Sequence, residues 1–312
     1  MTPSHGTDGP AVGAGHTLTE IASQPDLWRR AVDLARDKDT PVAGLPEPGE
    51  RVAVVGCGTS WFVAQAYAVL REQAGHGWTD AFAASEFPYG RGYDRVLALS
   101  RSGTTTEVLG LLARLRGTVA TTVLTGSPGT PAVTAADALV MLDFADESSV
   151  VQTRFATTAL ALLRAHLGED LDAAIRDAAV AAVDPLPEPL VAAEQFTFLG
   201  SGWTVGLAAE AALKMREAAG AWTESYPAME YRHGPITIAA PGRVTWVLGP
   251  APDGLTHDVA ATGGRLVVGT ADPMAELVRV QRLAATIAYA RGLDPDHPRH
   301  LTRSVVLEQE RQ

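Results

Sequence analysis

The sequence contains a single cysteine, Cys57, among 312 residues. One cysteine excludes an internal disulfide, a zinc site built from several thiolates and an iron–sulfur cluster. No apolar run reaches the roughly 18 residues that a membrane-spanning helix needs, and the first 15 residues lack the apolar centre of a secretion signal. We therefore expect a cytoplasmic protein that does not bind a membrane.

Positive charge is also scarce. Lysine and arginine together number 25 against 36 aspartate and glutamate residues, which gives a formal net charge of −11 at pH 7. The chain has no lysine- or arginine-rich run, whereas a face that binds nucleic acid needs a basic surplus. Nucleic acid is therefore not an expected partner.

Short, β-branched strands alternate with helices along most of the chain. The expected strands are residues 52–55, 96–100, 121–125, 138–142, 196–200, 244–249 and 265–270. The expected helices are residues 61–74, 106–116, 153–167, 204–219 and 274–291. Such alternation is typical of parallel sheets that helices cover on both faces. We predict an α/β protein.

Proline-rich connectors at residues 40–50 and 183–190 divide this alternation into two halves. The stretches VAVVGCGTS (52–60) and FTFLGSGWT (196–204) both run from a strand through Gly-X-Gly into an alanine-rich helix, which indicates a duplicated unit. We expect a disordered tail at 1–15, two N-terminal helices within 16–45 that are separated near Pro25, a first domain at 46–182 and a second domain at 190–312.

Two strand-to-helix turns in the first half, GCGTS (56–60) and SRSGTTTE (100–107), combine glycine with hydroxyl side chains. Ligands of parallel α/β sheets bind beyond the carboxyl ends of the strands. Helix N-termini at that edge present free N–H groups and a positive dipole end, which favour an anion. The turns therefore predict a phosphate site.

Several hydroxyl groups of these turns can donate hydrogen bonds to phosphate oxygens, namely those of Ser60, Ser100, Ser102 and Thr105. The alternative is that the hydroxyl groups only cap helices, with Thr104 and Glu107 forming a capping box. Neither turn matches a P-loop or the complete dinucleotide fingerprint, so NAD is not expected.

Glu210, Lys214 and Glu217 lie on one face of the helix expected at 204–219, because they are spaced by four and three residues. One interpretation is a solvated stripe of salt bridges. The surrounding alanine and leucine residues favour a helix packed on several sides instead. A carboxylate beside an ammonium in a closed cleft can act as a general base on a C–H next to a carbonyl. We expect Glu217 and the loop 100–105 to face one cleft.

His233 precedes Gly-Pro in the stretch EYRHGP (230–235), so it is expected at a turn. Histidine can move protons near neutral pH, although a single loop histidine is more commonly just exposed. His297 and His300 have no metal-ligand spacing with it. No metal site is expected.

Seven motifs in a fixed order along residues 16–308 resemble those of tandem sugar isomerase (SIS) domain proteins. They are GCGTS, ASEF (84–87), SRSGTTTE, ESSVVQT (147–153), EAALKMRE (210–217), AMEYRHGP (228–235) and HPRHLTRSV (297–305). The chain is similar to the isomerase half of glucosamine-6-phosphate synthase, and to amino-sugar-phosphate deaminases, ketose/aldose isomerases and fructosamine-phosphate deglycases of amino-sugar metabolism.

The resemblance implies two tandem SIS domains, each a flavodoxin-like parallel sheet between two helical layers. It also implies a sugar 6-phosphate ligand, no metal or redox cofactor, and a homodimer that shares its active sites. The residues that match the family's substrate-binding positions are Thr59 and Ser60 near the sugar, and Ser100, Arg101, Ser102 and Thr105 around the phosphate.

The catalytic residues are also implied by the resemblance. Glu217 matches the base that moves a proton between C1 and C2, and Lys214 and Glu210 match its neighbours on the helix. His233 matches the histidine that opens the sugar ring, which the partner chain supplies in such dimers. Ring opening comes first because a cyclic hemiacetal has no carbonyl to acidify the adjacent C–H.

The chain departs from the synthase pattern at two positions of the expected site. Arg303 stands where the family has a lysine that can form a Schiff base. A guanidinium stays protonated and cannot form one, but it can pair with a phosphate or a carboxylate. Gln152 replaces a serine, in a VVQT segment that looks more like the deaminases and deglycases.

The sequence also has no room for the glutaminase domain of the synthase, so we expect no self-contained glutamine amidotransferase. The leading prediction is an isomerase, deaminase or deglycase that acts on an amino-sugar or ketosamine 6-phosphate. One alternative is a non-catalytic sugar-phosphate-binding protein, which Arg303 favours. Another is a synthase-like subunit that receives ammonia from a separate glutaminase.

Overall fold

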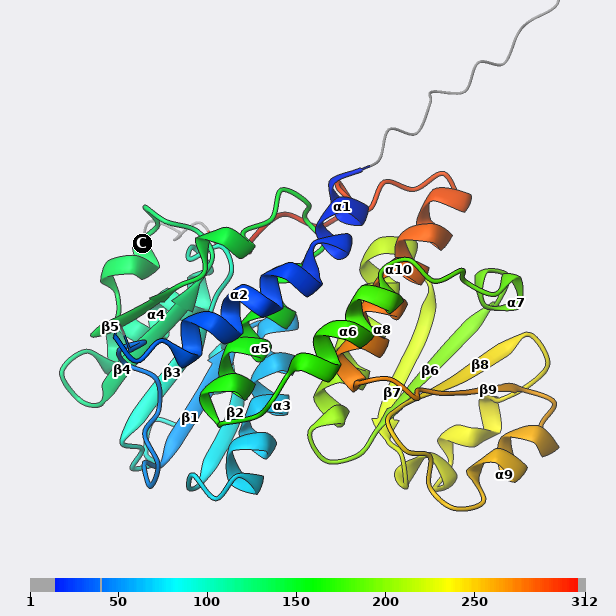
Figure 1. Cartoon of the computed structure of the whole chain (residues 1–312), viewed down its shortest axis with the longest axis horizontal. Coiled ribbons are helices and arrows are strands. Elements are labelled where there is room, and N and C mark those ends of the chain that lie inside the picture. Colours follow the sequence, from blue (N-terminus) through cyan, green and yellow to red (C-terminus); the bar gives the residue numbers. More distant parts are fainter. Residues whose placement is uncertain (1–14, 40, 308–312) are drawn as a thin grey trace, which may run out of the picture.

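The computed structural model describes residues 15–39 and 41–307, so most of the tail expected at 1–15 lies outside the described residues. Two parallel sheets form its framework (Figure 1). The first contains β2 (Thr79–Ala83), β1 (Val52–Gly56), β3 (Arg95–Leu99), β4 (Ala120–Thr125) and β5 (Ala138–Met141), in that order. The second contains β7 (Trp222–Pro227), β6 (Gln195–Gly200), β8 (Arg243–Leu248) and β9 (Arg265–Val268), in that order. The predicted α/β class with parallel sheets is confirmed.

The two sheets share one strand order. In each, the second strand along the chain forms one edge, the first strand lies beside it, and the later strands follow on the other side. This is the order of flavodoxin-like sheets, and within the described ranges the first sheet has five strands and the second has four. The similar stretches 52–60 and 196–204 begin on β1 and β6, which occupy the same place in their sheets.

The edge strands β2 and β7 are absent from the sequence prediction. Most of their residues are only partly buried, whereas every residue of β1 and β6 is buried. An edge strand covered on few sides needs no continuous apolar run, so its sequence gives no strong strand signal.

Helices surround both sheets. They are α1 (His16–Ala22), α2 (Gln24–Arg36), α3 (Thr59–Gln73), α4 (Thr106–Leu115), α5 (Arg154–His166), α6 (Asp172–Ala181), α7 (Glu188–Val191), α8 (Thr204–Ala219), α9 (Leu255–Ala261) and α10 (Pro273–Ala290). Short 3-10 helices are η1 (Ala84–Glu86), η2 (Pro131–Thr134), η3 (Asp143–Ala145), η4 (Glu230–Arg232) and η5 (Pro235–Ile238).

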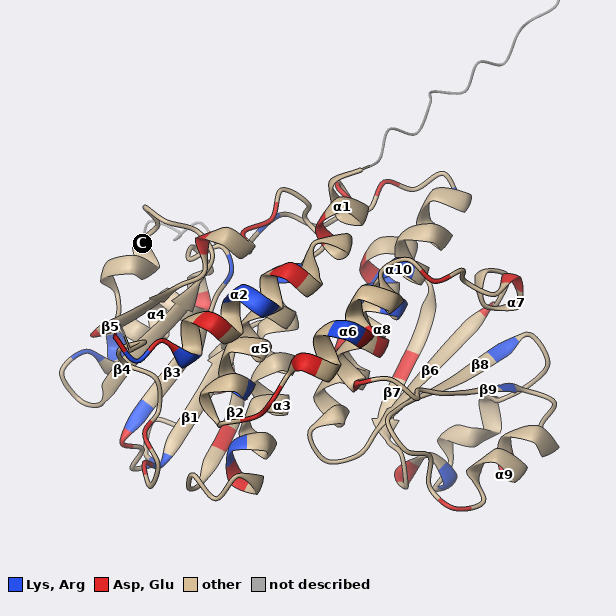
Figure 2. Ribbon diagram, in the orientation of Figure 1, with Lys and Arg blue, Asp and Glu red and all other residues tan. Residues whose placement is uncertain are grey.

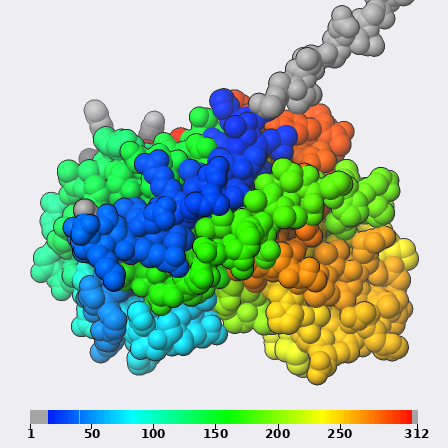
Figure 3. All heavy atoms as spheres, viewed as in Figure 1, coloured from blue at the N-terminus to red at the C-terminus, as the bar shows by residue number. Residues whose placement is uncertain are grey.

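The expected break between two N-terminal helices falls at Ser23, and Pro25 occupies the first turn of α2, where its missing N–H costs no hydrogen bond. α2 crosses the front of the molecule and packs against α5 and α6 (Figures 1 and 3). Its outer side carries charges of both signs, including an ion pair of 2.9 Å between Arg29 and Asp26 (Figure 2).

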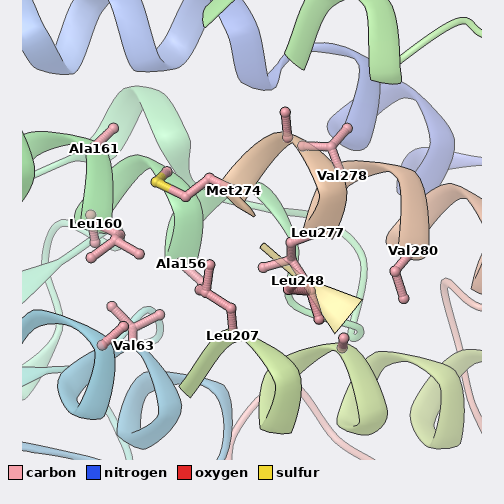
Figure 4. Packing of buried hydrophobic residues seen from close by; sticks show 14 of the residues in the cluster. Val63, Ala156, Leu160, Ala161, Leu207, Leu248, Met274, Leu277, Val278 and Val280 are labelled. Atoms are coloured by element: carbon pink, nitrogen blue, oxygen red, sulfur yellow. The ribbon is translucent and has the colours of Figure 1, made fainter. Parts of the chain in front are cut away.

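The largest hydrophobic cluster joins helices from both halves of the chain. Figure 4 shows Val63 of α3, Leu160 of α5, Leu207 of α8 and Leu277 of α10 around this core. α3 and α8 pack closely at Gly206, where a Cβ would lie 2.5 Å from the carbonyl oxygen of Phe62. This packing brings the N-terminus of α3 against the side of α8.

Across residues 15–39 and 41–307, no helix combines the length and the apolar character required to cross a membrane.

Candidate active site

A cavity of about 190 Å³ lies beyond the carboxyl ends of β1 and β3. These strands are parallel neighbours, so the loops that follow them emerge at the same edge of the sheet. The residues that line the cavity include Cys57, Thr59, Ser60, Ser100, Arg101, Ser102, Thr105, Val150, Gln152, Glu217 and 301–305. The prediction that Glu217 and the loop 100–105 face one cleft is confirmed.

The hydroxyl-rich loop is held in shape by its own side chains. The Ser100 Oγ accepts a hydrogen bond of 3.2 Å from the N–H of Gly103, and the Ser102 Oγ accepts one of 3.3 Å from the N–H of Thr104. Gly103 has φ +62, and a Cβ there would lie 2.1 Å from the Thr130 Oγ1. Only glycine fits this turn without strain.

α4 begins directly after the loop, with Thr105 as its N-cap residue. A capping box formed by Thr104 and Glu107 would need Thr104 as the N-cap, so that alternative is wrong, and the Thr105 side chain makes no capping hydrogen bond either. The Thr104 hydroxyl instead pairs with the Ser304 hydroxyl at 2.7 Å. Thr105 thus presents its side chain at the cavity wall and at the positive end of α4.

Arg101 lies in the cavity wall, but most of its guanidinium faces protein groups. It forms an ion pair of 3.4 Å with Glu147 and donates to the carbonyl oxygens of Ser149, Val150 and Arg303 at 3.2, 3.2 and 2.8 Å. Its Nε–H is buried without a partner among the described residues. Arg101 therefore ties the loop to residues 147–150 and to the C-terminal segment, and its predicted contact with phosphate stays a prediction.

The Gln152 side chain also lines the cavity, and its amide nitrogen is buried without a hydrogen-bond partner in the described part of the chain. The loop that carries it is anchored by Glu20 of α1. The Glu20 carboxylate accepts hydrogen bonds from the N–H of Ser148 and from the hydroxyl of Ser149. The N-terminal helices therefore help to place Gln152.

Glu210, Lys214 and Glu217 of α8 do not form a solvated stripe. Glu210 and Lys214 are fully buried, and the Glu217 side chain is 20% exposed at the cavity wall. The Lys214 Nζ lies 3.5 Å from the Glu210 Oε1, forms an ion pair with Glu217 and donates to the Thr59 Oγ1 at 3.0 Å. The interpretation as a packed helix is confirmed, because α8 contacts α3, α10, β6 and β7.

Burial and neighbouring charges raise the pKa values of both Glu210 and Lys214. Burial raises the pKa of Glu210 to about 8, against the opposing effect of the Lys214 ammonium. Burial alone would lower the pKa of Lys214, but Glu210 and Glu217 outweigh it and raise that pKa above its ordinary value. Lys214 is therefore a stable cation beside Glu217 at neutral pH.

Thr59 and Ser60, at the start of α3, are buried in the cavity wall. The preceding residue pair includes Cys57, which sequence reasoning did not assign to the site. Burial raises the pKa of the Cys57 thiol to about 11, so it is protonated at neutral pH and is not an activated nucleophile.

The C-terminal segment, residues 301–307, passes the carboxyl ends of the strands of the first sheet and covers the hydroxyl-rich loop (Figure 1). The Val305 carbonyl oxygen accepts a hydrogen bond of 3.1 Å from the N–H of Thr106, and the N–H of Leu307 donates to the Thr106 Oγ1 at 2.9 Å. Sequence reasoning named only Arg303 from this segment, although Leu301, Thr302, Ser304 and Val305 also line the cavity.

Arg303 lines the cavity, but its guanidinium binds a carboxylate. It forms an ion pair with Asp146, donates to the Ser127 Oγ at 3.1 Å and donates to the Glu147 carbonyl oxygen. Of the two partners considered for this residue, phosphate or carboxylate, the structure supplies the carboxylate.

His233 does not line the cavity of its own chain. It is exposed and follows η4, on the side of the second sheet. The structure therefore brings together all the predicted site residues except His233, with Glu210 and Lys214 behind the cavity wall.

No protein-family model matches the sequence. The chain is 28% identical to glutamine–fructose-6-phosphate aminotransferase (isomerizing) of Methanothermobacter thermautotrophicus, in an alignment that covers 93% of this chain and 57% of that protein. It is 29% identical to the protein of the same name from Gloeobacter violaceus, covering 93% and 58%. The chain thus spans little more than half the length of these relatives.

Both alignments reach across nearly the whole chain, as the resemblance of the ordered motifs predicts. These relatives support the resemblance to the sugar isomerase (SIS) family.

Solved structures share the fold of this chain. Glucosamine-6-phosphate deaminase from Thermotoga maritima superimposes with a TM-score of 0.75 at 24% identity, covering 94% of this chain and 100% of that one. Tagatose-6-phosphate ketose/aldose isomerase from Escherichia coli superimposes with a TM-score of 0.76 at 16% identity, covering 96% and 98%.

Proposed function

We propose that this protein binds a hexose 6-phosphate in the 190 Å³ cavity and moves a proton between C1 and C2 of the open-chain sugar. The observation that carries the proposal is that Glu217 and the hydroxyl-rich loop line the same cavity. The names of the relatives support the substrate class, because they refer to fructose, glucosamine and tagatose 6-phosphates.

In this proposal the phosphate lies against the loop 100–105 and the N-terminus of α4. Ser100, Ser102 and Thr105 supply hydroxyl groups, and the helix end favours the negative charge. The unpartnered Gln152 amide gains a hydrogen bond to the bound sugar. A buried donor without a partner costs about 1–3 kcal/mol, so a ligand that satisfies it is stabilised.

The proposed reaction starts with ring opening by His233 of the partner subunit, and the Glu217 carboxylate then takes the proton from the carbon next to the carbonyl. The same carboxylate returns it to the neighbouring carbon through a cis-enediol or enolamine, while a proton moves from the hydroxyl or amino group on one carbon to the carbonyl oxygen on the other. Lys214 orients Glu217, and Glu210 and Thr59 hold Lys214 in place. The transfer is redox-neutral overall, so the proposal includes no redox cofactor.

We further propose that the chain is a cytoplasmic homodimer of two tandem SIS domains, residues 46–182 and 190–312. The shared strand order of the two sheets supports this division. His233 is exposed and lies outside the cavity of its own chain. A residue that enters the site of a partner subunit must be exposed in this way.

The test is a panel of glucosamine, fructose, tagatose and fructosamine 6-phosphates in heavy water. NMR would follow deuterium entry at C1 and C2, and an ammonia assay would follow deamination. We expect exchange with at least one sugar, and a loss of about 10²- to 10⁴-fold in Glu217→Gln. Glu194→Gln, at an exposed glutamate that does not line the cavity, is the matched control. Equal exchange rates in Glu217→Gln and the wild type would refute the proposal.

The ion pair of Arg303 favours a second candidate function, a sugar-phosphate-binding protein without turnover, because no lysine amine is available at that position. Thermal unfolding separates the two. A sugar phosphate at 100 times its Kd should add about 2.7 kcal/mol to the free energy of unfolding in either case. Only the enzyme would also exchange protons at C1 and C2.

A further inference from the structure

The two cations nearest to the proposed base are already paired with protein groups. The Lys214 ammonium is engaged by Glu210 and Glu217, and the Arg303 guanidinium pairs with Asp146. Removal of a proton from the carbon next to a carbonyl puts negative charge on the carbonyl oxygen, and a hydrogen-bond donor aimed at that oxygen stabilises the transition state. The neutral donors of the cavity wall are left for this role.

One of these donors is the side-chain amide of Gln152, which lines the cavity. The amide makes no hydrogen bond within residues 15–39 and 41–307, and its nitrogen is buried there without a partner. Buried polar groups of proteins are nearly always hydrogen-bonded, so a buried N–H without a partner points to a ligand. Because neither end of the amide is held, it can turn about its last side-chain bond and present its N–H to a molecule in the cavity.

On one side, Gln152 is tied to the loop 100–105. Arg101 of that loop donates hydrogen bonds to the carbonyl oxygens of Ser149 and Val150, both at 3.2 Å. Val150 lines the cavity together with Gln152. The backbone that carries the amide is therefore fixed relative to the loop against which the phosphate is proposed to lie.

On the other side, Gln152 is tied to the charged group of α8. The buried Glu147 carboxylate accepts hydrogen bonds from the N–H and the hydroxyl of Thr153, the residue after Gln152. Burial alone would lower the pKa of Lys214, and Glu147 is one of the three carboxyl groups whose charge raises it instead. Gln152 thus lies between the phosphate loop and the Lys214–Glu217 pair, where the reacting carbons of the sugar are proposed to lie.

We infer that Gln152 is a catalytic residue whose amide N–H binds the carbonyl oxygen of the open-chain sugar and stabilises the negative charge that develops on it. The inference rests on the proposed function. When Glu217 takes the proton, the electron pair of the C–H bond forms a C=C bond and the carbonyl electron pair moves to the oxygen. The amide holds this oxygen and keeps its own protons. The proton that neutralises the oxygen comes from the hydroxyl or amino group on the neighbouring carbon.

The test compares the wild type with Gln152→Met, which keeps a side chain of similar length and removes the donor. Proton exchange is followed by NMR, and two unreactive ligands are measured by calorimetry. A hexitol 6-phosphate has a hydroxyl group in place of the carbonyl, whereas a pentonohydroxamate 5-phosphate imitates the planar enediolate. We expect kcat for exchange to fall about 10²- to 10³-fold. The loss of affinity should be roughly tenfold larger for the hydroxamate than for the hexitol.

An amide does not titrate, so the pH–rate profile of Gln152→Met should be lower than that of the wild type but keep its midpoints. Gln73→Met is the matched control, because Gln73 is exposed at the end of α3 and does not line the cavity. It should behave like the wild type. If thermal unfolding shows that Gln152→Met does not fold, Gln152→Ala replaces it in the same measurements.

Two outcomes would overturn the inference alone, in a folded Gln152 variant of a wild type that exchanges protons. They are an unchanged kcat and an equal loss of affinity for the two ligands. Either would assign the carbonyl oxygen to another donor, such as the hydroxyl groups of Thr59 and Ser60, which also line the cavity. A wild type that neither exchanges protons nor binds the hexitol 6-phosphate would instead count against the proposed function.

Discussion

The ammonium group of Lys214 lies inside the protein among the Glu210 and Glu217 carboxyl groups and the Thr59 hydroxyl. A buried ion pair gains little net stability over apolar side chains, because desolvation of each charge offsets their attraction. Loss of one partner is costly, since it leaves the other charge buried and unpaired. These residues are therefore best explained by the chemistry at Glu217 rather than by stability.

The raised pKa of Glu210 should make the stability of the protein depend on pH. Because burial raises its folded-state pKa from 4.5 to about 8, the folded protein binds more protons than the unfolded chain between these pH values. The free energy of unfolding should therefore fall as the pH rises through that window. In Glu210→Gln this contribution is missing, and urea denaturation from pH 5 to 8 should give a flatter profile. A slope as steep as that of the wild type would contradict the assignment.

At the scale of elements, the loop between β3 and α4 depends on Gly103. An alanine there would combine a φ of +62 with a Cβ 2.1 Å from the Thr130 Oγ1. We expect Gly103→Ala to lower the free energy of unfolding by about 1–3 kcal/mol and to weaken binding of hexose 6-phosphates, as measured by denaturation and calorimetry.

Gly110, on the exposed side of α4, is the matched control for that variant. A Cβ at this position meets no atom within 4 Å. Gly110→Ala should therefore stabilise the helix by about 0.5–1 kcal/mol and leave ligand binding unchanged. If both alanine variants had the same effect, the special role of the Gly103 turn would be ruled out.

At the scale of the whole molecule, one site is assembled from distant parts of the chain. The first sheet supplies the loops after β1 and β3, α8 supplies Glu217, and the C-terminal segment returns from α10 to the first sheet (Figure 1). The joint helical core holds these parts together, so the site depends on both halves at once.

If each subunit supplies His233 to the site of its partner, as proposed, a complete site also requires the dimer. Glu217→Gln and His233→Ala should each be inactive alone. When the two are unfolded and refolded together, half of the dimers are mixed, and each mixed dimer contains one complete site. We expect recovery of about a quarter of the wild-type activity. No recovery, from mixtures whose dimers have formed, would show that each site uses the His233 of its own chain or none.

The sequence by itself determined the buried strands, the hydroxyl-rich turns and the common face of Glu210, Lys214 and Glu217. These features depend on residues a few positions apart, and local spacing is readable along the chain. The tertiary structure decided the edge strands, the N-cap at Thr105, and the partners of Arg101 and Arg303. Those depend on contacts between residues that are distant in the sequence. Arg101 donates a hydrogen bond to the carbonyl oxygen of Arg303, 202 residues away, and Lys214 donates one to Thr59, 155 residues away. A side chain's partner is set by where the packed helices and sheets place it, and no local pattern encodes that position.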